Sequence, residues 1–312
     1  MGLEIFKAVG MERIKQRAIY RNEEMIDERG LSLNPKQLKP ILKWAGGKRQ
    51  ILPYLLKYLP DNFNTYYEPF AGGLALLIEL FNQNRIKKAV ISDINKDLIN
   101  LYRIIKEKPY DLISKLKEIP FKNNRDDYYS ARKLFNSIEP EENVTRAALL
   151  LYLNRHGYNG LYRVNSKGEF NVPFGRYDNP SLPDEDSIVK FHEMLKSCEI
   201  LNLDFAEAVK MARRSDFVYF DPPYMPLNET SYFTDYTSGG FSEVDQERLA
   251  SVFKRLSLEG VFVIQSNSDN QFIRQLYAEY NIVEIEARRN INSNASKRGS
   301  VKELIILNYQ VK

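Results

Sequence analysis

Residues 65–107 read TYYEPFAGGLALLIELFNQNRIKKAVISDINKDLINLYRIIKE. Two pieces of this stretch, TYYEPF and KKAVISD, are rich in the β-branched and aromatic residues that favour strands. Each is followed by a segment in which apolar residues recur at helical spacing. The order strand, turn, helix, strand, turn, helix predicts an α/β fold with a largely parallel sheet.

The same alternation returns in the second half of the chain. Ser242 is the expected N-cap of a helix that follows it, with Asp245 at the third helical position. The segments expected to be regular are, in chain order, the strands EILNLDF (199–205), DFVYF (216–220), GVFVIQSN (260–267) and ELIILNYQV (303–311), and the helices at 242–257 and 269–280.

The middle of the chain has a different character. Residues 113–155 favour helices and are more charged, whereas residues 156–183 are rich in Gly, Asn, Pro and basic residues and predict a loop or short hairpin. A loop of that length inside a compact domain is usually functional or disordered, and its aromatic and apolar residues argue against disorder. The predicted organisation is an N-terminal extension at 1–37, one α/β domain made of 38–112 and 198–312, and an insert at 113–197.

Composition restricts the class of protein. The net charge of +4 and the pI near 8.8 permit an anionic partner without requiring one. A single cysteine, Cys198, excludes an internal disulfide and fits a reducing compartment. No apolar run is long enough to span a membrane, and the N-terminus lacks the apolar stretch of a signal peptide. These features predict a cytoplasmic protein.

The turn EPFAGGLAL places Gly72 and Gly73 between a strand and a helix, at the sheet edge where ligands of α/β folds bind. Asp93 follows Gly72 by 21 residues, the offset at which an acidic side chain meets ribose hydroxyls. The full dinucleotide fingerprint is absent, which favours a nucleoside cofactor without a pyrophosphate over NAD. A glycine turn without a ligand, and an Asp93 that only caps the next helix, are the structural alternatives.

Another glycine loop stands earlier in the chain, LKWAGGKRQIL at 42–52, here called the first glycine loop, and it carries Trp44 and Lys48. Its spacing before the lysine does not match a P-loop, which disfavours ATP hydrolysis. The alternative is a turn with a surface lysine.

The stretch DFVYFDPPYMP at 216–226 is a buried strand that ends in a carboxylate, a rigid corner and an aromatic ring. Pro222 and Pro223 lack N–H groups, so their carbonyls are acceptors without an adjacent donor. Together with the Asp221 carboxylate they suit an –NH2 group, and Tyr224 offers a flat face for a planar ring. The predicted ligand is a planar ring with an exocyclic amine, such as adenine.

These motifs together resemble the DNA adenine-N6 methyltransferases of the Dam family, and look especially like the bacterial GATC methylases. The resemblance runs from about Lys39 to Tyr309 through KWAGGK, YYEPFAGGLAL, SDIN, NRHGYNGLYRVNSKGEFNVPFGRY and DFVYFDPPYMPL, in the family's order. It implies a Rossmann-like S-adenosylmethionine-dependent methyltransferase fold with a mostly parallel mixed sheet. It also implies that the insert at 113–197 is a mainly helical target-recognition subdomain.

The resemblance implies the cofactor S-adenosylmethionine, with S-adenosylhomocysteine as product and no metal. The two histidines, His156 and His192, and Cys198 make no persuasive metal set. By the same resemblance Asp93 would hold the ribose, and Asp204 and Phe205 would contact the adenine of the cofactor. The expected cofactor-binding residues are Trp44, Lys48, Pro69, Phe70, Gly72, Asp93, Asp204, Phe205 and Asp221.

The catalytic motif of the family corresponds here to Asp221, Pro222, Pro223 and Tyr224. Asp221 and the Pro222 carbonyl would accept both hydrogens of the adenine amine and direct its lone pair toward the methyl group. The adenine must leave the duplex to reach them, so base flipping is expected, with Tyr224 stacking on the extruded base.

Residues 155–177 resemble the target-recognition hairpin of these enzymes, which implies double-stranded DNA as the partner. Arg163 would bind a guanine edge, and Tyr158 and Asn159 would prop the disturbed duplex. Leu161 and Pro173 would contact a thymine methyl group, and Asn165 would join the interface. The expected phosphate contacts are Arg155, Lys167 and Arg176, and for Lys167 a solvated surface charge is an equal alternative.

Several other functions share parts of this pattern. Protein glutamine and N4-cytosine methyltransferases also present an amine to a Pro-Pro corner, but usually with Asn or Ser in place of Asp221. An RNA adenine methyltransferase and a catalytically silent DNA-binding regulator are further alternatives, although the catalytic and cofactor motifs are intact. A cognate restriction endonuclease would be a genetic partner without forming a stable complex, and the residues leave open whether the chain belongs to such a restriction-modification pair.

Overall fold

The computed structural model describes residues 25–26, 32–33, 37–44, 48–141, 143–225, 241–288 and 300–310. The chain forms two compact units, residues 1–38 and 39–312. In the first unit the described strands are β1 (Met25–Ile26) and β2 (Ser32–Leu33), which pair antiparallel. The rest of the predicted extension at 1–37 lies almost entirely outside the described residues. No described helix is long and apolar enough to cross a membrane.

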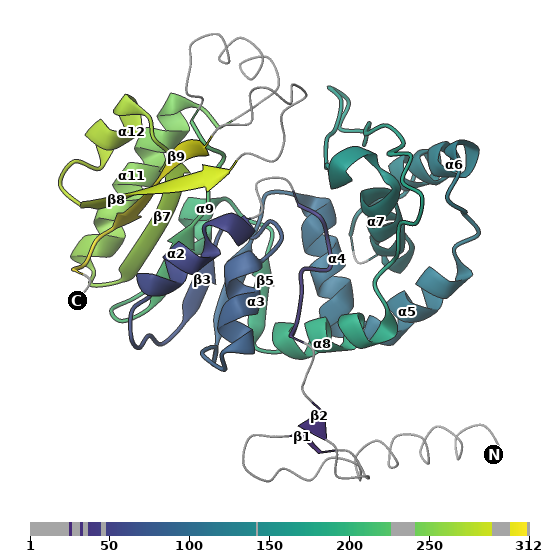
Figure 1. Ribbon diagram of the computed structural model, residues 1–312, viewed down its shortest axis with the longest axis horizontal. Coiled ribbons are helices and arrows are strands. Elements are labelled where there is room, and N and C mark those ends of the chain that lie inside the picture. Colours follow the sequence, from purple (N-terminus) through teal and green to yellow (C-terminus); the bar gives the residue numbers. More distant parts are fainter. Residues whose placement is uncertain are drawn as a thin grey trace. The chain divides into compact units, whose positions relative to one another are not determined.

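The second unit is built on a sheet of seven described strands in the order β5-β4-β3-β6-β7-β9-β8 (Figure 1). All pairs from β5 to β7 are parallel, and β9 runs antiparallel to both β7 and β8. The mostly parallel mixed sheet predicted from the sequence is therefore confirmed. The strands are β3 (Tyr66–Glu68), β4 (Ala89–Ser92), β5 (Cys198–Leu201), β6 (Phe217–Phe220), β7 (Phe262–Ser268), β8 (Asn281–Arg288) and β9 (Ser300–Leu307).

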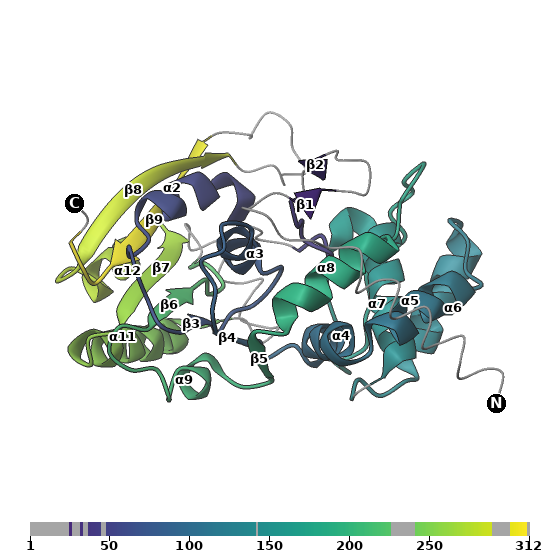
Figure 2. The same ribbon diagram turned by 90° about the horizontal axis from the view of Figure 1, so that it is seen from below.

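Helices cover both faces of this sheet. Figure 2 shows α2 and α3 on one side of the strands and α9 and α11 on the other. The bounds of these and one further helix at this end are α2 (Leu52–Lys57), α3 (Ala75–Asn82), α9 (Phe205–Ala208), α11 (Glu243–Leu258) and α12 (Gln271–Leu276). The cap expected for α11 is present, because the Ser242 side chain and Asp245 form a reciprocal capping box.

One expectation about the sheet was wrong, and one strand was missed. The strand expected at 199–205 ends at Leu201, because the Asp204 side chain accepts the Ala206 N–H and starts α9. Strand β8 was not expected at all, although its sequence NIVEIEAR alternates apolar and polar residues as a strand does.

The strand order places a ligand-binding edge at β3 and β6. Chain order runs outward from β3 through β4 to β5 in one direction, and from β6 to β7 in the other. Ligands of open α/β sheets bind outside the carboxyl ends of the strands where the order reverses. Glu68 ends β3 and Asp221 directly follows β6, so both lie at this reversal.

Alternation along the strands separates two layers of the core. Tyr67, Val218 and Phe220 belong to a hydrophobic cluster that also contains Leu249 and Phe253 of α11. Their neighbours in the strands, such as Tyr66 and Glu68, point to the opposite face, as the period of two requires.

A group of five helices lies beside the sheet (Figure 1). They are α4 (Lys96–Glu107), α5 (Pro109–Glu118), α6 (Arg125–Asn136), α7 (Val144–His156) and α8 (Glu185–Leu195). Asp97 of α4 accepts hydrogen bonds from the Arg146 side chain of α7, and both residues are buried. Residues 157–177, here called the bridged loop, follow α7 and are closed by antiparallel bridges between Gly157 and Phe174 and between Val164 and Phe170.

Candidate active site

The Asp221 carboxylate is held by groups from two other segments. Ser266 of β7 donates its hydroxyl to Asp221 Oδ1 at 2.9 Å, and Lys48 Nζ lies 3.0 Å from the same oxygen. Ser266 also shares a hydrogen bond with the Tyr219 hydroxyl at 3.1 Å. Lys48 belongs to η1 (Lys48–Gln50), which lies within the first glycine loop. The side chain of Asp221 remains 20% exposed, so its carboxylate is reachable from one side.

Tyr224 lies beside Asp221, and together with Lys48 these residues form a site here called the corner. Its hydroxyl donates to Glu303 Oε2 of β9 at 2.9 Å, which fixes the orientation of the ring. Lys48 Nζ lies 3.9 Å from the centroid of this ring. The ammonium therefore rests between a carboxylate oxygen and an aromatic face, where it makes an ion pair and a cation–π contact.

The two prolines are used differently. The Pro223 carbonyl accepts a hydrogen bond from Gln246 Nε2 of α11 at 3.0 Å. The chain after the prolines is also fixed, because the Met225 N–H donates to Asn267 Oδ1 and the Met225 carbonyl accepts from Ser268. Within the described part of the chain no protein group donates to the Pro222 carbonyl, which leaves it available as an acceptor.

Burial changes the acidity of the carboxyl groups at this edge. The pKa of Asp221 is raised by desolvation, although Lys48 and Ser266 favour its ionised form. The pKa of Glu68 is raised to about 8, mainly by desolvation and further by the charge of Asp221. Glu68 accepts a hydrogen bond from the Tyr66 hydroxyl at 2.9 Å. Near neutral pH Glu68 is therefore largely protonated. At Asp221 the Lys48 ammonium and the Ser266 hydroxyl oppose the effect of burial and favour the ionised carboxylate.

Asp93 organises the glycine turn beside this corner. Its two carboxylate oxygens accept the N–H groups of Gly72 at 3.0 Å and Asn95 at 2.9 Å. Gly72 has a positive φ of 44°, and a Cβ at this position would lie 3.0 Å from Trp44 Cδ1. The turn therefore requires glycine, and it brings Trp44 and Asp93 to the same backbone segment. Asn95 is the N-cap of α4, which the sequence analysis had considered for Asp93.

The two residues expected to contact the cofactor's adenine lie in different surroundings. Arg248 of α11 donates two hydrogen bonds to Asp204, at 2.8 and 2.7 Å, so that carboxylate is largely satisfied by the protein. Phe205 is buried and stacks against Phe70 with ring centroids 5.4 Å apart. Pro69 is buried beside Phe70, which is itself half-buried. The aromatic pair is thus present at the sheet edge, whereas Asp204 serves as a helix cap and ion-pair partner.

The bridged loop presents most of the residues expected to contact DNA. Arg163 is exposed and is steadied by Asn171, whose side-chain oxygen accepts from Arg163 Nε at 2.7 Å. Asn165 closes a turn by accepting the N–H groups of Lys167 and Glu169. Tyr158 is 50% exposed, which is unusual for a large aromatic side chain. The other expected contacts are exposed at Asn159, Lys167, Pro173 and Arg176 and half-buried at Leu161.

Arg155 differs from this set. It is half-buried on α7, and its Nη2 donates to the Ile41 carbonyl at 2.8 Å. This contact ties α7 to the segment that leads into the first glycine loop, so Arg155 has a structural partner that the sequence analysis did not foresee.

The hydrogen-bond acceptors and carboxyl groups at this edge of the sheet fit S-adenosylmethionine. Each oxygen of Asp93 accepts one backbone N–H and retains a lone pair, as a ribose diol needs. Burial raises the pKa of Glu68, Asp93 and Asp221, and a sulfonium cation nearby would favour their ionised forms. Among the described residues no cluster of three or more His, Cys, Asp or Glu side chains could hold a metal ion.

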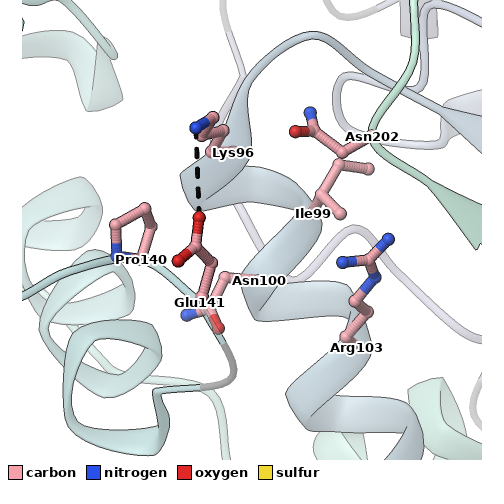
Figure 3. A pocket seen from close by; sticks show the side chains of 7 residues that line it. All are labelled: Lys96, Ile99, Asn100, Arg103, Pro140, Glu141 and Asn202. Atoms are coloured by element: carbon pink, nitrogen blue, oxygen red, sulfur yellow. Dashed lines mark ion pairs between the residues drawn. The ribbon is translucent and has the colours of Figure 1, made fainter.

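A small pocket of about 140 Å³ lies elsewhere, beside the first turns of α4 (Figure 3). Its Lys96 and Glu141 form an ion pair at 4.0 Å, and Asn202 donates to the Asp93 carbonyl at 2.8 Å. The volume is below the roughly 300–1,000 Å³ of ordinary ligand sites. We therefore assign no ligand to this pocket, and assign Asn202 a role in holding the backbone of Asp93.

Sequence reasoning missed the residues that support the corner. Ser266, Glu303, Gln246 and Glu68 are polar, buried or half-buried, and act on Asp221, Tyr224 or Pro223. For Ser266 the available signal was the run of polar residues inside the expected strand GVFVIQSN, since buried polar side chains require partners.

The chain matches known proteins over nearly its whole length. The sequence profile of the family described as D12 class N6 adenine-specific DNA methyltransferase matches residues 44–291. Type II methyltransferase M1.LlaDCHI from Lactococcus lactis subsp. cremoris is 46% identical over 283 residues, covering 89% of this chain and 98% of that protein. Type II methyltransferase M.MjaIII from Methanocaldococcus jannaschii is 42% identical, covering 88% and 100%. A DNA adenine methylase from Haemophilus influenzae is 38% identical, covering 91% and 98%.

The protonation of Glu68 should appear in the pH dependence of stability. Its pKa rises from 4.5 to about 8 on folding, so between these values the folded state binds more protons than the unfolded state. Stability is then lost as the pH rises through this window, by at most roughly 5 kcal/mol. Glu68→Gln keeps the neutral acceptor for Tyr66 and should lose less stability. Urea unfolding of both proteins at pH 5 and pH 8 measures the difference, and parallel pH profiles would contradict it.

Proposed function

We propose that this chain, which belongs to the D12 class of N6 adenine-specific DNA methyltransferases, methylates adenine in GATC sites of double-stranded DNA at the corner formed by Lys48, Asp221 and Tyr224. Membership in the family means site-specific transfer of a methyl group to N6 of adenine in DNA. The sequence preference, the residues and the steps below are our proposal.

The position of the Lys48 ammonium carries the assignment of the corner. An N–H donor already lies 3.0 Å from Asp221 Oδ1 and 3.9 Å from the Tyr224 ring centroid. The amine of a flipped adenine has the same requirements, namely an acceptor for its hydrogens and a face for its ring. In our account the amine takes the place of the ammonium when the base enters.

Asp221 and the Pro222 carbonyl then accept the two amine hydrogens. This removes the amine from conjugation with the ring and makes its lone pair available, and positioning of this kind supplies much of the acceleration. S-adenosylmethionine, held by Trp44, Gly72 and Asp93, would supply the methyl group: its S–CH3 bond would break as the N–CH3 bond forms, and S-adenosylhomocysteine would leave as a neutral thioether. The raised pKa of Asp221 makes its carboxylate a better acceptor for the proton that the alkylated nitrogen loses.

Polar side chains around the corner fix the positions of its acceptors and of the Tyr224 ring. Ser266 orients the Asp221 carboxylate, and Glu303 fixes the Tyr224 ring. Gln246 occupies the Pro223 carbonyl, so that the Pro222 carbonyl is the one left for the substrate. Because these acceptors are already oriented in the folded protein, the reaction requires no further free energy to reorganise them.

The bridged loop is the proposed reader of the DNA. Arg163 is exposed and directed by Asn171, as a bidentate contact to guanine O6 and N7 requires. The exposed Tyr158 is suited to fill the space that the flipped adenine leaves. Lys167 and Arg176 are charged and exposed, which fits phosphate contacts that position the duplex without specifying sequence.

Replacing Asp221 by Ala should remove catalysis and spare binding. The variant loses one of two acceptors for the amine, and we expect turnover to fall by roughly 10²-fold or more. Binding of a fluorescent duplex should remain close to wild type, because the side chain meets the DNA at the extruded base and not along the duplex. Glu207→Ala, an exposed carboxylate on α9, is the control and should retain turnover. An Asp221→Ala protein with near wild-type turnover would exclude the assigned role.

Replacing Arg163 by Ala should relax discrimination at one guanine. We expect the preference for GATC over a duplex altered at the first G to fall by about 1–3 kcal/mol, as measured by kcat/KM on both duplexes. Lys167→Ala should instead lower the affinity for both duplexes by the same factor and reduce the salt dependence of binding. Equal losses on both duplexes for Arg163→Ala would show that this side chain contacts phosphate.

A further inference from the structure

Asn154 of α7 holds two segments that the proposed function assigns to different tasks. It is 2% exposed, and its side-chain amide is fully engaged. Asn154 Oδ1 accepts the Lys43 N–H at 2.9 Å, and Asn154 Nδ2 donates to the carbonyls of Lys43 at 2.7 Å and Gly160 at 2.9 Å. One buried amide thus binds the first glycine loop and the bridged loop at the same time.

The two segments lie close together at Gly160. Gly160 has a positive φ of 62°, and a Cβ at this position would lie 2.5 Å from the Cβ of Lys43. No other residue fits there without moving the neighbouring chain. Lys43 directly precedes Trp44, so a shift of Gly160 would be transmitted to the segment expected to line the cofactor pocket.

Tyr162 makes a second connection between the same segments. Its ring stacks on Trp44 with centroids 5.8 Å apart and an interplanar angle of 27°. Its hydroxyl donates to Asp97 Oδ2 at 2.6 Å, in the first turn of α4 after Asp93. Tyr162 directly precedes Arg163, the proposed guanine contact. The stack therefore connects Trp44, expected at the cofactor, with a residue adjacent to the proposed DNA contact.

A third connection involves the side chain of Lys43. Its ammonium lies 4.6 Å from the centroid of the Tyr177 ring, and the Tyr177 hydroxyl accepts the Asn159 N–H at 2.8 Å. The backbone and the side chain of Lys43 therefore both contact the bridged loop.

We propose that Asn154 is a positioning residue that joins Lys43, at the start of the first glycine loop, to Gly160 of the bridged loop, so that cofactor binding and DNA binding strengthen each other. The proposal rests on the proposed function, which gives these two loops their ligands. Ordering either loop with its ligand lowers the entropic cost of ordering the other, and such coupling is reciprocal. Asn154 touches neither ligand and acts through Lys43 and Gly160.

Asn136 of α6 provides a matched control. Its side-chain amide also makes two hydrogen bonds to the backbone of one residue. Nδ2 donates to the Phe170 carbonyl at 3.1 Å, and Oδ1 accepts the Phe170 N–H at 2.9 Å. Phe170 lies on the far limb of the bridged loop. Asn136 therefore stabilises the loop without a hydrogen bond to the first glycine loop, which separates support of the loop from coupling.

The test compares Asn154→Asp with Asn136→Asp in the full-length protein. Each aspartate keeps the acceptor oxygen and replaces the donating amide by an oxygen that repels the facing carbonyls. Calorimetry gives the Kd of S-adenosylhomocysteine without DNA and with a saturating GATC duplex, and the ratio is the coupling factor. We expect about 5-fold or more for the wild type, a value near 1 for Asn154→Asp, and the wild-type ratio for Asn136→Asp.

Three results would overturn the proposal: a wild-type ratio of 1, an unchanged ratio in Asn154→Asp, or equal loss in both variants, which would make Asn154 merely structural. If Asn154→Asp does not fold, Tyr162→Leu replaces it and must also lower the ratio. Label transfer by the wild type to adenine is measured separately. An enzyme that binds both ligands but methylates no adenine refutes the proposed function, whereas the ratio depends on binding alone.

Discussion

A carboxylate buried at the end of a parallel strand costs free energy unless protein groups replace its water. Asp221 meets this condition through Lys48 from the first glycine loop and Ser266 from β7. The architecture of the site follows from it. Lys48 comes from a segment distant in the chain, Ser266 is a buried polar residue of β7, and Tyr219 shares a hydrogen bond with its hydroxyl.

The neighbouring carboxyl groups divide the work by their surroundings. Glu68 is buried with a tyrosine hydroxyl and has a pKa of about 8, so it adds little negative charge behind Asp221 near neutral pH. Asp93 uses its oxygens to hold a glycine turn. Asp204 is paired with Arg248. Three acidic residues at one edge of the sheet thus have three roles, and only their partners distinguish them.

Local signals allowed much of this to be predicted from the sequence. A buried strand running into Asp221, the Ser242 capping box and the Gly72 turn each depend on residues close in the chain. The partners of the corner could not be found in that way, because Lys48, Ser266 and Glu303 come from distant segments that meet only in the folded sheet. Asp204 illustrates the error that results. It was read as the end of a strand, whereas Arg248, 44 residues away, and the cap of α9 determine its position.

The central claim is that a methyl group reaches N6 of an adenine at the Asp221 corner. The most direct measurement supplies S-adenosylmethionine labelled in the methyl group, digests the product duplex to nucleosides and identifies the labelled one. The account predicts label in N6-methyladenine alone, from a GATC duplex and not from one altered at the first G. Label in N4-methylcytosine, or in no nucleoside although the cofactor is bound, would contradict it.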